Sequence, residues 1–462
     1  MFADQSPPKG TGSGARPLRV AVVGSGIAGL AVAHTLRGYA DVTLFEAGSY
    51  FGGHTHTVDV TLPTPQGPVT HGVDTGFLVL NERTYPNLLA LFAQLDVPVV
   101  PSDMSFSVQV PGAGPDTGAD RTLEWSGTSL STVFAQRANL TNGRFWRMLA
   151  DLLRFNRLAT RLAKGLDLPG QEAALMQPLG EFLKQHRFSD EFRDWYFLPM
   201  LGCIWSCPTD QMLQFPVATM VRFCHNHGLI QVTNRPQWFT VKGGARHYVD
   251  KIVQGMPDAR LNTPVRLIQR DEHGVRVVTD GRAERFDKVV LACHSDQALA
   301  LLADPTDAER RVLGAIRYQA NRAVLHTDVS VLPKRTSAWA AWNYERAAQT
   351  DREHAQVCLH YLINKLQPLP WQQPVVVSLN PVQDIPASHV IGAYDYAHPV
   401  FDLAAIEAQR DLPGLQGTHG TYFCGAWAGY GFHEDGLKSG LQVGRQLLLQ
   451  SPVAQLGKAD AR

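Results

Sequence analysis

The sequence lacks long hydrophobic runs, an excess of either charge, and a regular set of cysteines. Its 462 residues include 42 Lys+Arg and 42 Asp+Glu, so the net charge is zero. This balance gives no electrostatic basis for binding nucleic acid, and no apolar stretch approaches the length that crosses a bilayer. Six irregularly spaced cysteines predict no disulfide framework and suit a reducing cytoplasm. With 44% hydrophobic residues, the chain can bury the cores of two domains.

The pattern of metal-ligating residues is also sparse. Cys203, Cys207 and Cys224 lie near His225 and His227, but the first two cysteines sit in an apolar stretch. No second compact pair follows them. We therefore expect buried thiols here and no metal site.

The clearest motif lies near the N-terminus. A β-branched run over 18–23 meets Gly24, Gly26 and Gly29, a helical pattern begins, and a second apolar run ends at Glu46. Glu46 follows Gly26 by 20 residues, which is the spacing of the dinucleotide-binding fingerprint. The glycines permit a tight turn and the close approach of a pyrophosphate, which the N-terminus of the following helix stabilises. The carboxylate would accept hydrogen bonds from ribose hydroxyls.

Two further segments favour FAD over NAD. The pair Gly52-Gly53 follows Glu46 closely and predicts a second loop against the pyrophosphate of a longer cofactor. Near the C-terminus, 421–425 reads as a buried strand, and Asp435-Gly436 opens a helical pattern that runs to Leu448. The N-terminus of that helix would stabilise negative charge on a flavin ring.

Together these segments resemble the flavin-containing amine oxidase superfamily. Within it, they are similar to a bacterial FAD-dependent oxidoreductase subgroup that resembles the N-terminal flavoprotein domain of plant cyclopropane fatty acid synthases. The resemblance is carried by the fingerprint and by residues 72–81, 204–206, 226–229, 237–244, 342–344, 364–367, 398–401 and 429–436. It implies non-covalent FAD and an α/β plus α+β fold. A Rossmann-like FAD-binding domain (GR2 type, amine oxidase-like) would be interleaved with a mixed substrate-binding domain.

The motif and the resemblance together predict a set of cofactor-binding residues, in which Val265 lies beside the adenine by resemblance alone. The set is Gly24, Gly26, Ile27, Ala28, Gly29, Glu46, Ala47, Gly52, Gly53, His54, Thr55, Thr75, Gly76, Phe77, Val265, Gly425, Ala426, Glu434, Asp435 and Gly436.

The chain is expected to alternate between the two domains. Residues 18–80, 236–300 and 415–450 are assigned to the FAD-binding domain, 81–235 and 301–414 to the substrate-binding domain, 1–17 to a flexible leader and 451–462 to a loose tail. The segment 81–235 reads as mostly helical and 305–410 as strand-rich. Strands over 264–268, 275–278 and 286–292, separated by turn signals, predict a meander.

The predicted substrate side is aromatic rather than charged. Candidate substrate residues, each of which can instead be ordinary core packing, are Trp205, Trp238, Trp342, Tyr344, Tyr430 and Phe432. Four amides in or beside strand-like runs either orient a substrate head group or tie strands together: Asn343, Asn364, Gln367 and Asn380.

Three departures from the superfamily pattern argue against amine oxidation. The stretch 293–301 lacks the lysine usual there, His54 replaces an arginine, and His433 occupies the place of a cage tyrosine. Because imidazole titrates near neutral pH, His433 is the candidate catalytic acid or base. The alternative is a histidine that only hydrogen-bonds the flavin or the backbone.

Residues 144–166 lie in a predicted basic amphipathic helix that begins at Gly143. One face carries Met148, Leu152, Phe155, Ala159, Leu162 and Leu166, and another carries Arg147, Arg154, Arg157, Arg161 and Lys164. Such a helix can lie on an anionic membrane surface, or it can be an ordinary domain helix with a solvated basic edge. We expect a cytoplasmic protein, with this helix as its peripheral contact to the inner membrane.

From the resemblance and this helix we predict an FAD-dependent oxidoreductase that desaturates or dehydrogenates a fatty acyl chain drawn from phospholipid. Oxygen or an electron carrier would reoxidise the flavin. Three alternatives stay open: an amine oxidase, a flavin-dependent fatty acid double-bond isomerase, and a non-catalytic flavoprotein partner of a lipid methyltransferase.

Overall fold

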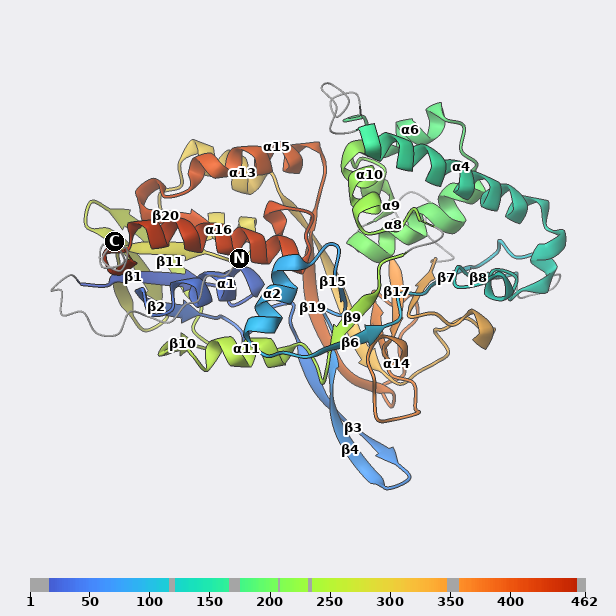
Figure 1. Cartoon of the computed structure of the whole chain (residues 1–462), viewed down its shortest axis with the longest axis horizontal. Helices are drawn as coiled ribbons and strands as arrows, with labels where there is room; N and C mark the ends of the chain where they lie inside the picture. The colour runs from blue at the N-terminus through green and yellow to red at the C-terminus, as the bar shows by residue number, and fades with distance from the viewer. Residues whose placement is uncertain are drawn as a thin grey trace.

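The computed structural model describes residues 16–115, 121–165, 175–206, 208–231, 235–346 and 357–454 (Figure 1). The predicted leader and tail therefore lie largely outside the described residues, as do Cys207 and Leu166. In Figure 1 most elements of the expected FAD-binding domain gather on the left, whereas its hairpin over residues 57–74 projects at the bottom. Helices α4, α6 and α8–α10 lie at the upper right, with the long strands β15 and β19 between the two groups.

A five-stranded parallel sheet forms the first layer. Its order is β10-β2-β1-β14-β20, built from β1 (Leu18–Val23), β2 (Ala40–Phe45), β10 (Asp258–Arg260), β14 (Lys288–Leu291) and β20 (Thr421–Phe423). All of its pairings are parallel. The strands come from each of the three segments assigned to the FAD-binding domain, so the predicted Rossmann-like sheet is confirmed.

The helix that follows β1, α1 (Ile27–Leu36), packs closely against the C-terminal helix α16 (His433–Gln450). A Cβ at Gly440 would lie 2.2 Å from the Ala28 carbonyl oxygen, and one at Gly436 would lie 2.8 Å from Ile27 Cγ2. Since only hydrogen fits at these positions, glycine allows the helices to approach. The N-termini of α1 and α16 consequently lie side by side.

The predicted meander forms from β11 (Val265–Asp271), β12 (Gly274–Thr279) and β13 (Ala283–Phe286). The expectation of one strand over 286–292 is wrong, because the chain turns at Asp287 and enters the parallel sheet as β14. The Asp287 carboxylate accepts a hydrogen bond from the Arg19 N–H at 2.7 Å. This bond attaches the turn to β1.

A second hydrophobic core joins the meander to the parallel sheet. Helices α12 (Ser295–Leu301), α13 (Asp307–Gly314) and α15 (Leu403–Asp411) surround it. Val312 and Ala405 pack in the same cluster as Ala21 and Phe45. Helices α13 and α15 belong to the segment 301–414, assigned from the sequence to the substrate side, yet they pack with the FAD-binding sheet.

A seven-stranded sheet of order β19-β15-β18-β17-β16-β7-β8 forms the other layer. Its strands are β7 (Phe106–Val110), β8 (Leu123–Ser126), β15 (Arg317–His326), β16 (Trp342–Glu345), β17 (Cys358–Leu362), β18 (Val376–Leu379) and β19 (Val390–Val400). Most of them come from 305–410, as predicted. Trp342 and Tyr361 pair on the apolar face of this sheet, and Asn343 and His360 pair on its polar face.

Helices follow β8 along the chain: α3 (Leu130–Val133), α4 (Gly143–Gly165), α6 (Leu179–Gln185), α7 (Asp190–Phe192), α8 (Leu198–Trp205), α9 (Thr209–Met212) and α10 (Val217–Asn226). The expectation that 81–235 is mostly helical is correct from α3 onward. It is wrong where the chain forms β6 (Val99–Ser102), β7 and β8. Strands β6 and β7 pair with β9 and β16, whose positions far along the chain hide the pairing from local pattern.

Smaller elements connect these layers. They are the hairpin β3 (Thr57–Thr64) and β4 (Gly67–Asp74), the strand β9 (Trp238–Val241) that pairs with β5 (Leu80–Asn81) on one side and β6 on the other, and the helices α2 (Pro86–Gln94), α11 (Arg246–Val253) and α14 (Ile363–Leu366). Short helical turns are η1 (Arg137–Thr141), η2 (Arg193–Phe197), η3 (Thr336–Ala338), η4 (Leu412–Leu415), η5 (Thr418–Gly420) and η6 (Ala426–Ala428). Within the described ranges, no helix has both the length and the apolar character needed to cross a bilayer.

Candidate functional site

The glycine turn between β1 and α1 leaves open space in front of Gly26. A Cβ at Gly24, whose φ is +101°, would lie 3.1 Å from the Ala292 carbonyl group, and one at Gly29 would lie 1.9 Å from the Gly24 carbonyl oxygen. A Cβ at Gly26 would meet no protein atom within 4 Å. Gly26 is also the N-cap of α1, and no side chain caps the helix there. The open room and the uncapped N–H groups fit a pyrophosphate.

The second glycine loop lies against the first. Gly26 and Gly52 form an isolated parallel bridge, and a Cβ at Gly53 would lie 3.2 Å from Gly26 Cα. Positive φ angles of +121° at Gly52 and +58° at Gly53 favour glycine at both positions. The structure therefore brings together the two loops that the sequence assigns to one pyrophosphate.

Glu46 lies at the end of β2, beside the first loop. Its Oε2 accepts hydrogen bonds from the Ser25 N–H at 3.0 Å and the Ser25 hydroxyl at 2.5 Å, and its Oε1 accepts one from the Gly48 N–H at 2.8 Å. These bonds orient the carboxylate and leave Oε1 a lone pair for a ribose hydroxyl. The Thr263 N–H donates to the Glu46 carbonyl, which brings the buried Val265 to the same end of the sheet.

Residues 75–77 lie between the glycine loops and α16. The Phe77 N–H donates to the His54 carbonyl at 2.8 Å, and a Cβ at Gly76 would lie 2.2 Å from the same oxygen. The Thr75 hydroxyl lies 2.8 Å from the Tyr396 hydroxyl. These contacts hold the segment that follows β4 beside the loop that contains Gly52 and Gly53.

The N-terminus of α16 lies on the other side of the site. The Asp435 carboxylate accepts a hydrogen bond from the Phe432 N–H at 3.1 Å and so caps the helix. Burial raises the pKa of Asp435 to about 6. A Cβ at Gly436 would lie 3.5 Å from the Ala426 backbone nitrogen, so Gly425 and Ala426 lie directly beside the helix start.

The side chain of Glu434, which the sequence assigned to the cofactor, points elsewhere. The buried Glu434 carboxylate accepts hydrogen bonds from the Asn87 N–H, the Asn87 amide and the Leu88 N–H at 3.1, 2.7 and 3.0 Å. It caps α2, so only the main chain of Glu434 is left for a cofactor. Ala47 lies exposed at the surface.

His433 is the first residue of α16 and is partly buried. Its ring lies parallel to that of Phe77, with 3.8 Å between the centroids. Its Nε2 is 2.8 Å from Thr55 Oγ1 and 3.0 Å from the Tyr248 hydroxyl. Burial lowers the pKa of His433 to about 3. The expectation that this ring titrates near neutral pH is wrong, because burial removes the solvation of the imidazolium and the contacts supply hydroxyls instead of a carboxylate.

Sequence reasoning missed a cluster of rings around His54. The rings of Tyr396, His398 and His294 lie 4.9, 5.2 and 6.5 Å from the His54 ring, measured between centroids. Burial, with His398 and His294 adding to it, holds the pKa of His54 well below its usual value. Its Nε2 is buried and has no hydrogen-bond partner among the described residues. A group bound beside the glycine loops could supply that partner. The sequence could have indicated this cluster only through the position of His54 after the glycine pair.

Comparison with known proteins gives the family of this chain. The profile of the flavin containing amine oxidoreductase family matches residues 27–448. The chain belongs to this family. It is an FAD-dependent oxidoreductase.

Solved structures with a similar fold include two enzymes. One is a CLA-producing fatty acid isomerase from P. acnes, with 16% identity, 94% of this chain and 99% of that chain covered, and a TM-score of 0.64. The other is cyclohexylamine oxidase from Brevibacterium oxydans IH-35A, with 15% identity, 96% and 100% covered, and a TM-score of 0.64. At these identities the similarity establishes the fold alone. No curated protein matches the chain.

In this flavin-dependent oxidoreductase the predicted substrate residues fall into two groups. In the first group, Trp205, Tyr430 and Phe432 contact the ring of Phe223 on α10. The ring of His227 also contacts Phe223 and connects it to Trp238. The second, Trp342 and Tyr344, lies on the apolar face of the seven-stranded sheet. Tyr361, 4.9 Å from Trp342 between ring centroids, hydrogen-bonds to Ser206. Because Ser206 follows Trp205, the two groups adjoin.

Two indole N–H groups in these clusters are unsatisfied. Trp205 Nε1 and Trp342 Nε1 are buried without a hydrogen-bond partner in the described ranges. An unpaired buried donor costs about 1–3 kcal/mol, so a ligand that accepts a hydrogen bond would be favoured there.

The four amides tie the protein together. Asn343 Oδ1 accepts from the Ser107 hydroxyl, Asn364 Oδ1 from the Val375 N–H, Gln367 Oε1 from the Asp74 N–H, and Asn380 Oδ1 from the Arg322 N–H. Of the two interpretations left open by the sequence, strand connection accounts for these contacts.

Helix α4 has the predicted buried face, with Met148, Phe155 and Ala159 in the core. Its basic side chains divide into two sets. Arg154 donates to the carbonyl groups of residues 186 and 187 and pairs with Asp151, so it is a structural residue. Arg147 lies 3.8 Å from Glu191. In the part of the chain that the structure describes, Arg157, Arg161 and Lys164 are exposed without an ion pair.

Exposed apolar side chains lie on α4 and on the two elements that precede it. They are Leu130, Leu140, Trp146 and Leu153, with exposed fractions of 81%, 52%, 49% and 47%. Leu140 and Trp146 are in contact, since the indole N–H donates to the Leu140 carbonyl at 2.9 Å. Exposed apolar and basic side chains on one helix are typical of a surface that binds anionic lipid.

Proposed function

We propose that this enzyme removes a hydride from an apolar fatty acyl chain. The observation that carries the proposal is the aromatic cluster around Phe223, which extends through Phe432 to His433 at the start of α16. Aromatic and apolar walls suit a hydrocarbon chain, whose transfer out of water is favourable. The fatty acid isomerase named above supports the proposal, because a related fold there acts on a fatty acid.

The buried carboxylates around the site are committed to protein contacts. Asp74 accepts hydrogen bonds from the Ala245 N–H and the Gln367 amide, Glu434 caps α2 and Asp435 caps α16. None of these three is free to balance a substrate ammonium group. This commitment favours an acyl chain over an amine.

The unpaired indole groups suggest how the acyl chain is oriented. Trp205 Nε1 and Trp342 Nε1 are donors without acceptors. A carboxylate or ester carbonyl at the head of an acyl chain can accept from them. These indoles would position the head group while the surrounding rings exclude water from the chain.

Bound FAD supplies the group that accepts the hydride. Desaturation, the reaction favoured by the sequence, also needs a base for the neighbouring proton, and a His433 ring with a pKa of about 3 is a poor base at neutral pH. Double-bond isomerisation returns the hydride to another carbon of the same chain and needs no base. The neutral ring therefore favours isomerisation as the second candidate.

The exposed region of α4 supplies a route to lipid. Arg157, Arg161 and Lys164 offer positive charge, and Trp146 and Leu153 offer apolar area. An anionic phospholipid surface complements both features. Docking there would let the enzyme take an acyl chain without exposing it to water.

Anaerobic mixing of the flavin-loaded enzyme with fatty acids and phospholipid extracts tests the proposal. Desaturation should bleach the flavin absorbance, because the flavin is the only hydride acceptor under these conditions, whereas isomerisation returns the hydride and should leave the flavin oxidised. Mass spectrometry would then show an added double bond when an acceptor is consumed, or a shifted double bond when none is consumed.

Simple amines serve as the contrasting probe. Bleaching by cyclohexylamine or putrescine, with no response to any lipid, would contradict the proposal and favour an amine oxidase. An unresponsive flavin together with stable capture of a lipid methyltransferase would favour the non-catalytic partner.

A further inference from the structure

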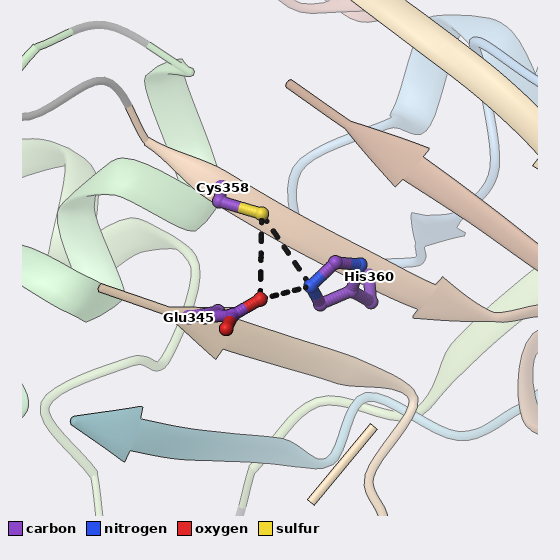
Figure 2. Close-up of side chains that lie close together, drawn as sticks. All are labelled: Glu345, Cys358 and His360. Atoms are coloured by element: carbon purple, nitrogen blue, oxygen red, sulfur yellow. Dashed lines mark hydrogen bonds and ion pairs between the residues drawn. The ribbon is translucent and has the colours of Figure 1, made fainter. Parts of the chain in front are cut away.

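Three potential ligand atoms converge on the polar face of the seven-stranded sheet (Figure 2). Cys358 and His360 alternate along β17 and so share a face, and Glu345 lies opposite Cys358 on β16. His360 Nε2 is 3.0 Å from Glu345 Oε2 and 3.4 Å from Cys358 Sγ, and that sulfur is 4.0 Å from the same carboxylate oxygen. Cys358 and His360 are buried, so the cluster is largely shielded from water.

The arrangement differs from that of a nucleophilic triad. In a Cys–His–acid triad the thiol and the carboxylate contact opposite ring nitrogens, and the ring relays a proton between them. Here both contact Nε2 of His360. Three ligand atoms that surround one point are instead typical of a metal site.

The other ring nitrogen of His360 has its own partner. His360 Nδ1 is 2.7 Å from the Ser378 hydroxyl, which is 2.6 Å from His326 Nε2. The Asp328 N–H donates to His326 Nδ1, so His326 carries its proton on Nε2 and donates it to Ser378. The serine oxygen can accept a second hydrogen bond from His360 Nδ1–H. His360 Nε2–H then donates to the Glu345 carboxylate, and the loss of this proton on metal binding would direct the Nε2 lone pair at the ion, as metal-binding histidines require.

We propose that Glu345, Cys358 and His360 bind a zinc ion. Sulfur, nitrogen and oxygen ligands together suit this borderline-soft cation. Zinc bond lengths place the ligand atoms of a tetrahedral site about 3.3–3.7 Å apart, so the three separations need to change by only a few tenths of an ångström. A water molecule would complete the tetrahedron.

The site lies away from the aromatic clusters. Trp342 and Tyr361 occupy the opposite face of the same strands, and the polar face lies under residues 327–341, where the Gln109 amide donates to the Val331 carbonyl. The ion would join the end of β16 to the start of β17. We therefore infer that this ion takes no part in the flavin reaction.

Cobalt substitution and metal analysis test this site on the flavin-loaded full chain. One equivalent of Co²⁺ is expected to produce the absorption of a tetrahedral ion, with a thiolate-to-cobalt charge-transfer band that zinc abolishes. The variants Cys358→Ser and Glu345→Gln should lower bound zinc at least tenfold. Cys293→Ser, a change at a cysteine in the FAD-binding part, should leave the band and the zinc content unchanged.

A second measurement, the melting temperature of the wild type with added metal, tests the site without relying on variants that fold poorly. Zinc at micromolar concentration should raise the melting temperature of the wild type, whereas Mg²⁺ at the same concentration should not. Absence of a thiolate band in folded wild-type protein would overturn the proposal, leaving a hydrogen-bonded cluster only. Zinc retained at full stoichiometry by Cys358→Ser would also overturn it.

Discussion

The rings of His433 and Phe77 stack at 3.8 Å, with an angle of 11° between their planes. Phe77 follows β4 and His433 begins α16, so the pair joins the N-terminal and C-terminal parts of the FAD site. The stack covers one face of the imidazole, and the hydroxyls of Thr55 and Tyr248 occupy its Nε2. No carboxylate contacts the ring through these bonds, which is why it stays neutral.

Gly26→Val is expected to abolish FAD retention without unfolding the protein. The new side chain meets no protein atom within 4 Å at its Cβ, but it fills the room in front of the α1 N-terminus where a pyrophosphate fits. The ratio of flavin to protein absorbance should fall at least tenfold. The melting temperature of the variant should match that of wild-type protein stripped of flavin.

Gly29→Ala serves as the matched contrast. Its Cβ would lie 1.9 Å from the Gly24 carbonyl oxygen, so this smaller change should destabilise the fold itself. If Gly26→Val retains FAD, the pyrophosphate does not bind at this turn.

His433→Gln is expected to weaken the dependence of stability on pH. The folded-state pKa of about 3 lies below the unfolded value, so the unfolded chain binds the proton first as pH falls. The contribution of His433 to the free energy of unfolding is full above about pH 6.5 and is lost toward pH 3. Between pH 7.5 and 5.0 the wild type should lose about 2 kcal/mol more than the variant.

Urea denaturation of both proteins at the two pH values measures this difference. His273→Gln, at a side chain that is 74% exposed, should behave like the wild type. Equal pH dependence in His433→Gln and the wild type would contradict the buried, neutral ring.

Glu434→Gln should reduce stability while leaving the flavin content per folded chain unchanged. The carboxylate accepts three hydrogen bonds at the start of α2, and an amide there would present a donor to N–H groups. Leaving one such group unpaired costs about 1–3 kcal/mol in unfolding free energy. Glu407→Gln, an exposed change on α15, should cost nothing measurable. Loss of FAD without loss of stability would assign the carboxylate to the cofactor instead.

Reversal of charge at Arg157 and Arg161 should weaken binding to anionic phospholipid vesicles about tenfold or more. Flotation of the vesicles at low and high salt measures this binding. Salt should weaken the binding of the wild type as well. The double variant Lys242→Glu/Arg276→Glu makes the same charge change elsewhere. Lys242 is exposed between β9 and α11, and Arg276 is exposed on β12, so this variant should bind the vesicles normally. Wild-type protein that shows no salt-sensitive flotation would make α4 an ordinary domain helix.

Several features could be predicted from the sequence because they depend on residues that are neighbours along the chain. The run into Gly24, Gly26 and Gly29, with Glu46 at its fixed spacing, identified the strand, turn and helix. The period of apolar residues predicted a helix over 143–166, and α4 occupies Gly143–Gly165. Local conformational preference and periodicity are sufficient for such elements.

Other features depend on partners that only folding brings together. The turn at Asp287, the pairing of β6 and β7 with distant strands, and the capping of α2 by Glu434 are of this kind. The convergence of Glu345, Cys358 and His360 belongs with them.

The ionisation of His433 shows the same division most plainly. The sequence determined that an imidazole stands at the start of the C-terminal helix, beside the flavin site. Tertiary structure decided that this ring is neutral, because packing against Phe77 and hydrogen bonds to hydroxyls replace the water that would stabilise its charge. Motif spacing is a property of the chain, whereas solvation and the identity of contacting groups are properties of the fold.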